Sequence, residues 1–261
     1  MGFVRTGDIE IYHEVAGDGP PVLLISGTGA DLRNVPHERH PLTRHFEVHA
    51  YDQRGLGQSS KPDEPYTMAD YADDAAGLLG ALGVGPVHVV GVSFGGMVAQ
   101  HLALRHPAVV DRLVLMCTSP GGPMPSLDLL AMADLSPEDH EAAYLPLMDT
   151  RIVPGQPVPD DLERILALRA MRRPVTDPQA KRGARRQLEA RAGHDVFDRL
   201  GEISAPTLVI GGRTDGVAPP ENQQAMADRI PDARLVLCHG GHMFALQDKT
   251  AWPTVIAFLQ E

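Results

Sequence analysis

Short apolar runs recur along the chain, and segments with helical periodicity separate most of them. The clearest runs are dominated by Val, Leu and Ile, and they lie at residues 22–25, 87–90, 113–116, 207–210 and 235–237. Such runs are typical of strands that are buried on both faces of a sheet. Apolar positions repeat with a helical period at residues 68–82, 223–230 and 254–259. Strands that alternate with helices predict an α/β fold, with a mostly parallel sheet and helices on both of its faces.

Two strand patterns near the amino terminus extend this sheet. Residues 3–15 alternate between apolar and polar positions around a turn at residues 6–8, which predicts a β-hairpin. Residues 46–51 form a further apolar strand pattern.

The alternation of strands and helices stops between about residues 120 and 200. This region contains frequent prolines and amphipathic helical patterns at residues 127–133 and 162–171, but no clear strand pattern. A helical insertion in an α/β chain is typical of a lid over one end of the sheet. We therefore predict a core formed by residues 1–119 and 201–261, with a helical cap at residues 120–200.

The most informative motif is the Gly-Val-Ser-Phe-Gly sequence at residues 91–95. It follows an apolar strand pattern and precedes a helical pattern, so Ser93 is expected at the tip of a sharp strand-to-helix turn. This context is typical of a nucleophile elbow, in which the serine hydroxyl is exposed. Ser93 is therefore the candidate nucleophile, although Gly and Ser are also common in ordinary loops.

A serine hydroxyl needs a neighbouring base and a third group that orients the base. We assign His242 as the base, because it follows the last strand and two glycines that allow a close approach to other backbone. His239 is expected to face solvent, and His194 to lie in the cap. Asp215 follows the strand at residues 207–210 and is the candidate orienting carboxylate, although alone it would be a turn residue or helix cap. The order Ser, Asp, His is the order found in α/β hydrolases.

Two backbone N–H groups are the candidates for an oxyanion hole. The first belongs to Phe94, which begins the helix after the serine, where the helix dipole favours negative charge. The second belongs to Thr28 in the loop after the strand at residues 22–25, with Gly27 as the alternative.

Candidate substrate-pocket residues are apolar or close to these loops. They are Gly27, Phe94, Met97, Met124, Met148 and Met171, although at helical spacing most methionines belong to ordinary cores. Nine basic residues against two acidic ones lie between Arg164 and Arg191. A solvated helix face is the simpler interpretation of this cluster, and attraction of a carboxylate-bearing substrate is the alternative.

A dinucleotide-binding loop is a competing interpretation of residues 27–29. Gly27-Thr28-Gly29 follows a strand, and Asp52 ends the next strand, as that fingerprint requires. The third glycine position is Leu32, however, and two strands precede this unit. We interpret residues 52–59 as a structural turn, in which Arg54 pairs with Asp52 or caps strand ends.

Composition and charge narrow the functional classes. The chain has 261 residues and a net charge of −11, so nucleic acid and anionic membranes are poor partners. The two cysteines, Cys117 and Cys238, are expected to be buried free thiols, and a cytoplasmic location fits. We find no signal-peptide pattern and no apolar run long enough to span a bilayer. No metal-ligand spacing is present, no cofactor is expected, and the sequence is compatible with a monomer or a homodimer.

The motifs together resemble the α/β-hydrolase family. Residues 52–59, 91–96, 206–215 and 241–242 fall in the family's order. The resemblance implies an eight-stranded sheet, a helical cap after the sixth strand and the triad Ser93, Asp215 and His242. The loop at residues 26–32 resembles that of 3-oxoadipate enol-lactonases. Ser93 in place of Asp argues against haloalkane dehalogenases and epoxide hydrolases, and the missing His-Gly loop argues against meta-cleavage C–C hydrolases.

These features predict a serine hydrolase that acts on a small carboxylic ester or lactone through an acyl-enzyme. Three alternatives stay open on the sequence. They are a C–C bond hydrolase or lyase, a biosynthetic thioesterase or cyclase, and a receptor that binds small molecules on the same fold.

Overall fold

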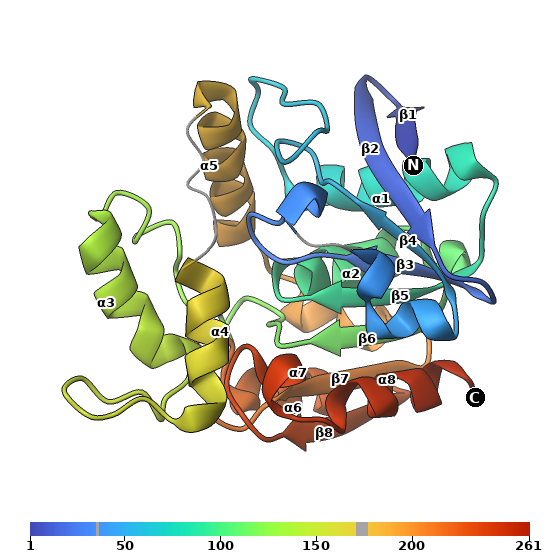
Figure 1. The fold of residues 1–261 in the computed structure, drawn as a ribbon. Coiled ribbons are helices and arrows are strands. Elements are labelled where there is room, and N and C mark those ends of the chain that lie inside the picture. The colour runs from blue at the N-terminus through green and yellow to red at the C-terminus, as the bar shows by residue number, and fades with distance from the viewer. Residues whose placement is uncertain (35–36, 171–176) are drawn as a thin grey trace.

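An eight-stranded sheet forms the centre of the molecule (Figure 1). The computed structural model describes residues 1–34, 37–170 and 177–261. The strand order is β1-β2-β4-β3-β5-β6-β7-β8, and only the β1–β2 and β2–β4 pairs are antiparallel. The strands are β1 (Gly2–Thr6), β2 (Ile9–Ala16), β3 (Pro21–Ile25), β4 (Glu47–Tyr51), β5 (Val87–Val92), β6 (Val110–Met116), β7 (Thr207–Gly212) and β8 (Ala233–Cys238). The expected fold class, a mostly parallel eight-stranded sheet, is confirmed.

Helices cover both faces of this sheet (Figure 1). The α-helices are α1 (Met68–Leu82), α2 (Phe94–Arg105), α3 (Pro137–Met148), α4 (Asp160–Ala170), α5 (Pro178–Ala192), α6 (Pro220–Arg229), α7 (Phe244–Gln247) and α8 (Ala251–Leu259). Short 3-10 helices are η1 (Leu32–Asn34), η2 (His37–Arg39), η3 (Pro41–Arg44), η4 (Pro107–Val109) and η5 (Phe197–Glu202). None of the helices that the structure describes is both long and apolar enough to cross a membrane.

The alternation of side chains along each strand divides the core into two layers. In β3, Leu23 and Ile25 belong to the cluster that packs against α1, α2 and α6. Val22 and Leu24 belong to the second cluster, which packs against α8. Because successive side chains point to opposite faces of a sheet, a strand covered on both faces must be apolar throughout. This is why the central strands are continuous apolar runs in the sequence.

Helix α1 has the bounds that the periodicity predicts, because both of its ends carry local signals. The Thr67 hydroxyl accepts the backbone N–H of Asp70, and the Asp70 side chain in turn accepts the backbone N–H of Thr67. This capping box satisfies two backbone donors that have no partner inside the helix. Gly83 ends the helix in the left-handed conformation, at φ 67°.

The described part of the segment between β6 and β7 contains α3, α4 and α5, joined by loops and turns. Figure 1 shows these helices gathered at one end of the sheet. The pattern at residues 162–171 corresponds to α4. The helix expected at residues 127–133 is wrong, because this stretch forms turns. The backbone of Leu127 is instead held by tertiary bonds, donating to Val217 O at 2.7 Å and accepting from Arg191 at 2.6 Å.

The turn after β4 is held by hydrogen bonds of Asp52 and Arg54, and the partner of Arg54 differs from the one expected. The Asp52 carboxylate accepts the backbone N–H groups of Leu32 and Gln58, both at 2.8 Å. Arg54 forms two bonds to Asp74 in α1, at 2.6 and 2.7 Å, and does not pair with Asp52. One oxygen of Asp52 therefore holds this turn and the other holds the segment after β3, which argues against the role of ribose acceptor in a nucleotide site.

Candidate active site

Ser93 lies at the sharp turn between β5 and α2, with φ 54° and ψ −115°. A positive φ is rare for a residue with a side chain and stores backbone strain. The glycines of the motif are required sterically. A Cβ on Gly91 would overlap the carbonyl of Gly95, and a Cβ on Gly95 would overlap the carbonyl of Ile25. The strand, the turn and the helix therefore approach one another more closely than larger residues allow.

The structure brings Ser93, His242 and Asp215 into one hydrogen-bonded chain. Nε2 of His242 lies 3.0 Å from Oγ of Ser93, and Nδ1 lies 2.8 Å from Oδ2 of Asp215. Because the carboxylate is an acceptor, Nδ1 carries the proton, and Nε2 accepts from the serine hydroxyl. The three residues follow β5, β7 and β8, so they meet at the carboxyl ends of parallel strands.

Asp215 is held on both of its oxygens. Its second oxygen, Oδ1, accepts the backbone N–H groups of Val217 at 2.8 Å and Ala218 at 2.9 Å. The residue is only 2% exposed. These bonds orient the carboxylate toward the imidazole and compensate for the loss of water around its charge.

The two other histidines considered from the sequence do not reach Ser93. The side chain of His239 is 61% exposed and lies 3.4 Å from Asp161. His194 is buried, and its ring nitrogens lie 2.9 Å from the carbonyl of Ser119 and 3.2 Å from His101. Only His242 of these three bridges a hydroxyl and a carboxylate.

Cys117 is a second nucleophilic side chain close to this site. Its backbone follows β6 with a positive φ of 40°, and its thiol is buried near Asp215 and the backbone of Ser93. Burial raises the pKa of the Cys117 thiol well above its usual value, and the negative charge of Asp215 raises it further. The thiol therefore stays protonated and is a poor nucleophile.

The loop after β3 approaches the serine from the other side. A Cβ on Gly27 would lie 3.5 Å from Cβ of Ser93. Within the described chain, the N–H groups of Thr28 and Phe94 have no hydrogen-bond acceptor, so both are available to a ligand. The next N–H, that of Gly29, donates at 2.8 Å to the side-chain carbonyl of Gln187 in α5.

Gln187 was not identified from the sequence. Gln187 is fully buried, and its Nε2 has no hydrogen-bond partner among the described residues. The buried hydroxyl of Thr28 also has no described partner. The contact between Gly29 and Gln187 joins residues 158 positions apart. A glutamine in a charged amphipathic helix gives no local signal for such a contact.

The candidate pocket methionines lie in different environments. Met97 is 2% exposed within the main core, and Met148 is 1% exposed in a small cluster with Leu162 and Ile165. Met124 is half-buried, and Met171 lies outside the described residues. The carbonyl of Met148 accepts the backbone N–H of His242 at 2.7 Å, so this methionine contacts the histidine loop through its backbone.

The described basic side chains of the helical segment divide into two kinds. Ion pairs of 2.8–2.9 Å join Arg182 to Asp63, Arg185 to Asp134 and Arg186 to Glu189, as expected for a solvated helix face. Arg191 is instead buried and donates to the neutral oxygens of Leu127 and Ser126. The side chains of Arg164 and Arg169, and all of Arg172 and Arg173, lie outside the described residues.

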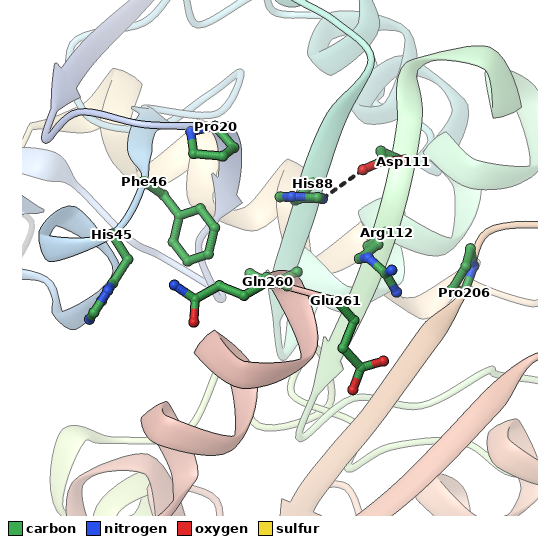
Figure 2. A pocket seen from close by; sticks show the side chains of 10 residues that line it. Pro20, His45, Phe46, His88, Asp111, Arg112, Pro206, Gln260 and Glu261 are labelled. Carbon is green, nitrogen blue, oxygen red and sulfur yellow. Dashed lines mark ion pairs between the residues drawn. The ribbon is translucent and has the colours of Figure 1, made fainter.

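A pocket of about 610 Å³ lies at the opposite end of the sheet from Ser93 (Figure 2). It lies where β5 and β6 begin, and Figure 2 shows His88 and Asp111 side by side in its wall, with Nδ1 3.1 Å from Oδ2. Because the Ser93 site lies at the carboxyl ends of these strands, this pocket is separate from it. Across the described ranges, no cluster of three or more His, Cys, Asp or Glu side chains could hold a metal ion.

Comparison with known proteins gives a consistent family. A family model described as the alpha/beta hydrolase fold matches residues 20–143 and 157–249. A poly(3-hydroxyalkanoate) depolymerase from Ectopseudomonas oleovorans is 32% identical over 244 residues, covering 92% of this chain and 84% of that protein. RutD from Yersinia enterocolitica, which is named for carbamate hydrolysis, is 30% identical over 250 residues, covering 90% and 87%.

A solved structure gives the same result. The enol-lactonase from Burkholderia xenovorans LB400 is similar over 100% of both chains, with a TM-score of 0.84 and 28% identity. The family match extends over most of the chain and includes the strands that carry Ser93, Asp215 and His242. The chain belongs to the α/β-hydrolase fold family of enzymes.

Proposed function

We propose that this protein hydrolyses carboxylic esters or lactones, with Ser93 as nucleophile, His242 as general base and Asp215 as its orienting partner. The observation that carries the proposal is the hydrogen-bonded chain from Ser93 Oγ through the imidazole to Asp215, with bonds of 3.0 and 2.8 Å. Both distances are within the range for a nucleophile and base that transfer a proton directly.

The geometry leads to an acyl-transfer mechanism. Nε2 of His242 takes the hydroxyl proton while Oγ of Ser93 attacks the substrate carbonyl. The imidazolium then gives this proton to the leaving alcohol oxygen, and an acyl-enzyme on Ser93 remains. A water molecule, deprotonated by Nε2 of His242, then attacks the carbonyl of the acyl-enzyme. The bond to Oγ of Ser93 breaks, the imidazolium returns its proton to this oxygen, and the acid is released. Asp215 keeps the proton on Nδ1 in both half-reactions.

The developing oxyanion lies between the N–H groups of Thr28 and Phe94 in this proposal. Phe94 directly follows Ser93, and Thr28 directly follows Gly27, which lies against Ser93. Neither N–H has a described acceptor. Loss of one such donor typically costs about 2.7–4 kcal/mol of transition-state stabilisation. Fixed backbone donors are effective because they need no reorganisation during the reaction.

The relatives support an ester or lactone as the substrate class. A polyhydroxyalkanoate depolymerase and an enol-lactonase both act, by their names, on carbonyl–oxygen bonds. A carbamate is the second candidate, because of the 30% identity to RutD. Ser93 can attack a carbamate carbonyl in the same way. The nitrogen then either stays in the acyl-enzyme, when the alcohol leaves, or departs as the amine.

A fluorophosphonate probe tests the nucleophile, because it reacts with an activated serine. We expect rapid labelling of the wild type and none of Ser93→Ala. The matched pair His242→Gln and His239→Gln tests the base, because the two histidines share one loop. We expect a loss of roughly 10⁴-fold to 10⁶-fold in turnover for His242→Gln and wild-type activity for His239→Gln. A wild type that resists the probe as fully as Ser93→Ala would refute the proposed function.

The substrate class needs a separate comparison of kcat/KM. Short nitrophenyl esters, five- and six-membered lactones, nitrophenyl carbamates, thioesters and vinylogous 1,5-diketones would be compared with one enzyme preparation. We expect esters or lactones to react fastest. Faster cleavage of the diketone would establish a C–C hydrolase instead, and faster thioester cleavage a thioesterase.

A further inference from the structure

One short segment of the helical region contacts both loops that carry the partners of Ser93. This segment, residues 147–151, comprises the last two residues of α3 and the beginning of the connection to α4. Its backbone accepts the N–H of Gly216 at Leu147 O, 2.8 Å, and the N–H of His242 at Met148 O, 2.7 Å. It also donates from Thr150 to Thr214 O at 2.9 Å. The loop after β7 and the loop after β8 are therefore held by the same segment.

The contact is close enough to require glycine in both loops. A Cβ on Gly216 would lie 2.9 Å from the carbonyl oxygen of Leu147. A Cβ on Gly241 would overlap the carbonyl of Met148 and lie 2.7 Å from Cα of Asp149. The two loops thus pack directly on the segment's backbone, with no side chain between them.

Asp149 adds a side-chain connection to each loop. Its Oδ1 accepts the hydroxyl of Thr214 at 2.9 Å, and its Oδ2 accepts Nε2 of Gln247 at 3.0 Å. Gln247 in turn accepts the backbone N–H of Gly241 at 3.0 Å. Thr214 directly precedes Asp215, and Gly241 directly precedes His242. The carboxylate therefore connects to the residue before each member of the pair.

The carboxylate is fixed from its other side. The Asp149 side chain is fully buried, and Arg151 donates to it at 3.0 and 2.7 Å. Arg151 also reaches Asp161 in α4, at 2.8 Å. A buried carboxylate with this many donors has a single orientation, because any rotation leaves hydrogen-bonding groups without partners.

We propose that Asp149 is a positioning residue that sets the distance between Asp215 and His242. It acts through Thr214 and Gln247 and does not touch the reacting atoms. This inference rests on the proposed function, because positioning matters only if the pair acts on Ser93. It further implies that a shift of residues 147–151 would move the loops that carry Asp215 and His242.

The most direct test removes the hydroxyl group of Thr214 while the charge and the approximate volume of the side chain are kept. Thr214→Val removes the donor to Asp149 and keeps the volume, whereas Thr214→Ser keeps the donor. Asp149→Asn replaces one carboxylate oxygen by an NH₂ group. This group cannot accept the hydrogen bond that Thr214 or Gln247 donates to Asp149 in the wild type. Asp134→Asn is the control, because Asp134 lies in the same helical region and pairs with Arg185, but is 79% exposed and has no described bond to either loop.

We expect Thr214→Val and Asp149→Asn to lower kcat for ester hydrolysis by about tenfold to a hundredfold, since small displacements of reacting groups have effects of this size. KM should change by less than about threefold, because substrate contacts are untouched. Fluorophosphonate labelling should slow in parallel with kcat, and Thr214→Ser and Asp134→Asn should behave as the wild type. Unfolding temperatures, measured for each variant, separate a loss of fold from a loss of position.

Wild-type kcat and labelling in Thr214→Val would overturn the inference, as would an equal loss in Thr214→Ser. If Asp149→Asn does not fold, the Thr214 pair still decides. A wild type that neither turns over esters nor reacts with the probe would overturn the proposed function itself, whereas failure of the inference alone leaves the wild type active.

Discussion

The side-chain carbonyl of Gln187 accepts the backbone N–H of Gly29 at 2.8 Å. Gln187 lies in α5, and Gly29 directly follows Thr28 in the loop after β3. Gly29 has a φ of 68°, so the chain turns at this residue. The contact therefore fixes the peptide next to the one whose N–H is proposed to bind the oxyanion.

Replacement of Gln187 by Leu should weaken this fixation. Leu has a similar size but no acceptor, so the Gly29 N–H loses its partner and the Thr28 peptide gains freedom. We expect kcat for ester hydrolysis to fall by about tenfold, less than the loss of an oxyanion donor itself. Gln179→Leu makes the same replacement at an exposed position of α5 and serves as the control. Equal kcat values in Gln187→Leu and the wild type would show that the loop does not depend on this bond.

Replacement by alanine should destabilise the protein at an elbow glycine and stabilise it at an exposed helix glycine. A Cβ on Gly95 would overlap backbone carbonyls of Ile25 and Ser26, so Gly95→Ala should destabilise by about 1–3 kcal/mol or more. Gly80 lies in α1 and is exposed, and a Cβ on it would meet no other atom within 4 Å. Gly80→Ala should therefore stabilise by about 0.5–1 kcal/mol. Urea unfolding of both variants would check the opposite signs.

The buried pair of Arg54 and Asp74 should be costly to break from one side. Arg54 is 8% exposed and Asp74 is 5% exposed, and two bonds of 2.6 and 2.7 Å join them. Asp74→Ala leaves the guanidinium buried without its partner and should cost about 3–5 kcal/mol.

The double variant Arg54→Met with Asp74→Ala removes both charges and should recover much of this loss. With the wild type and the single variants Arg54→Met and Asp74→Ala, it forms a double-mutant cycle in the free energy of unfolding. A coupling energy near zero would contradict the interpretation of Arg54 as a buried structural residue.

The histidine pair between α2 and the helical region should make stability depend on pH. Burial lowers the pKa of His194 to about 3 and that of His101 to about 4, against 6.5 in an unfolded chain. Between pH 6.5 and about 4 the unfolded chain therefore binds more protons, so stability falls as the pH is lowered. For His194 the slope is up to about 1.4 kcal/mol per pH unit.

His194→Gln should make this dependence less steep by about that amount. Free energies of unfolding at pH 4.5, 5.5 and 6.5 would be compared with the wild type and with a surface variant, His45→Gln. If His194→Gln and the wild type lose stability in parallel over this range, the buried histidine is not the titrating group.

Local signals in the sequence were sufficient for the architecture and for the choice of site residues. Apolar runs indicated the two-sided strands, and the helical period of apolar positions gave the bounds of α1. The motif around Ser93 could be interpreted because its residues form one strand–turn–helix unit, although Gly95 also approaches the carbonyl of Ile25 in β3. Asp215 and His242 followed from chain order, because loops after parallel strands share one edge of the sheet.

Patterns of this kind did not predict contacts made between distant polar groups. Arg54 pairs with Asp74 and not with Asp52, and residues 127–133 form turns although their pattern is helical. In each case a tertiary partner outweighed the local preference.

The sequence by itself determined the layers of the fold and the three residues proposed for catalysis, because periodicity and strand order are properties of the chain. Only the tertiary structure decided how those residues are held. Gln187 contacts a loop 158 residues away, and Asp149 contacts Thr214 across 65 residues. A polar side chain on a helix or in a connecting loop has no periodicity that identifies its partner, since the partner is chosen by how the helical segment packs on the sheet.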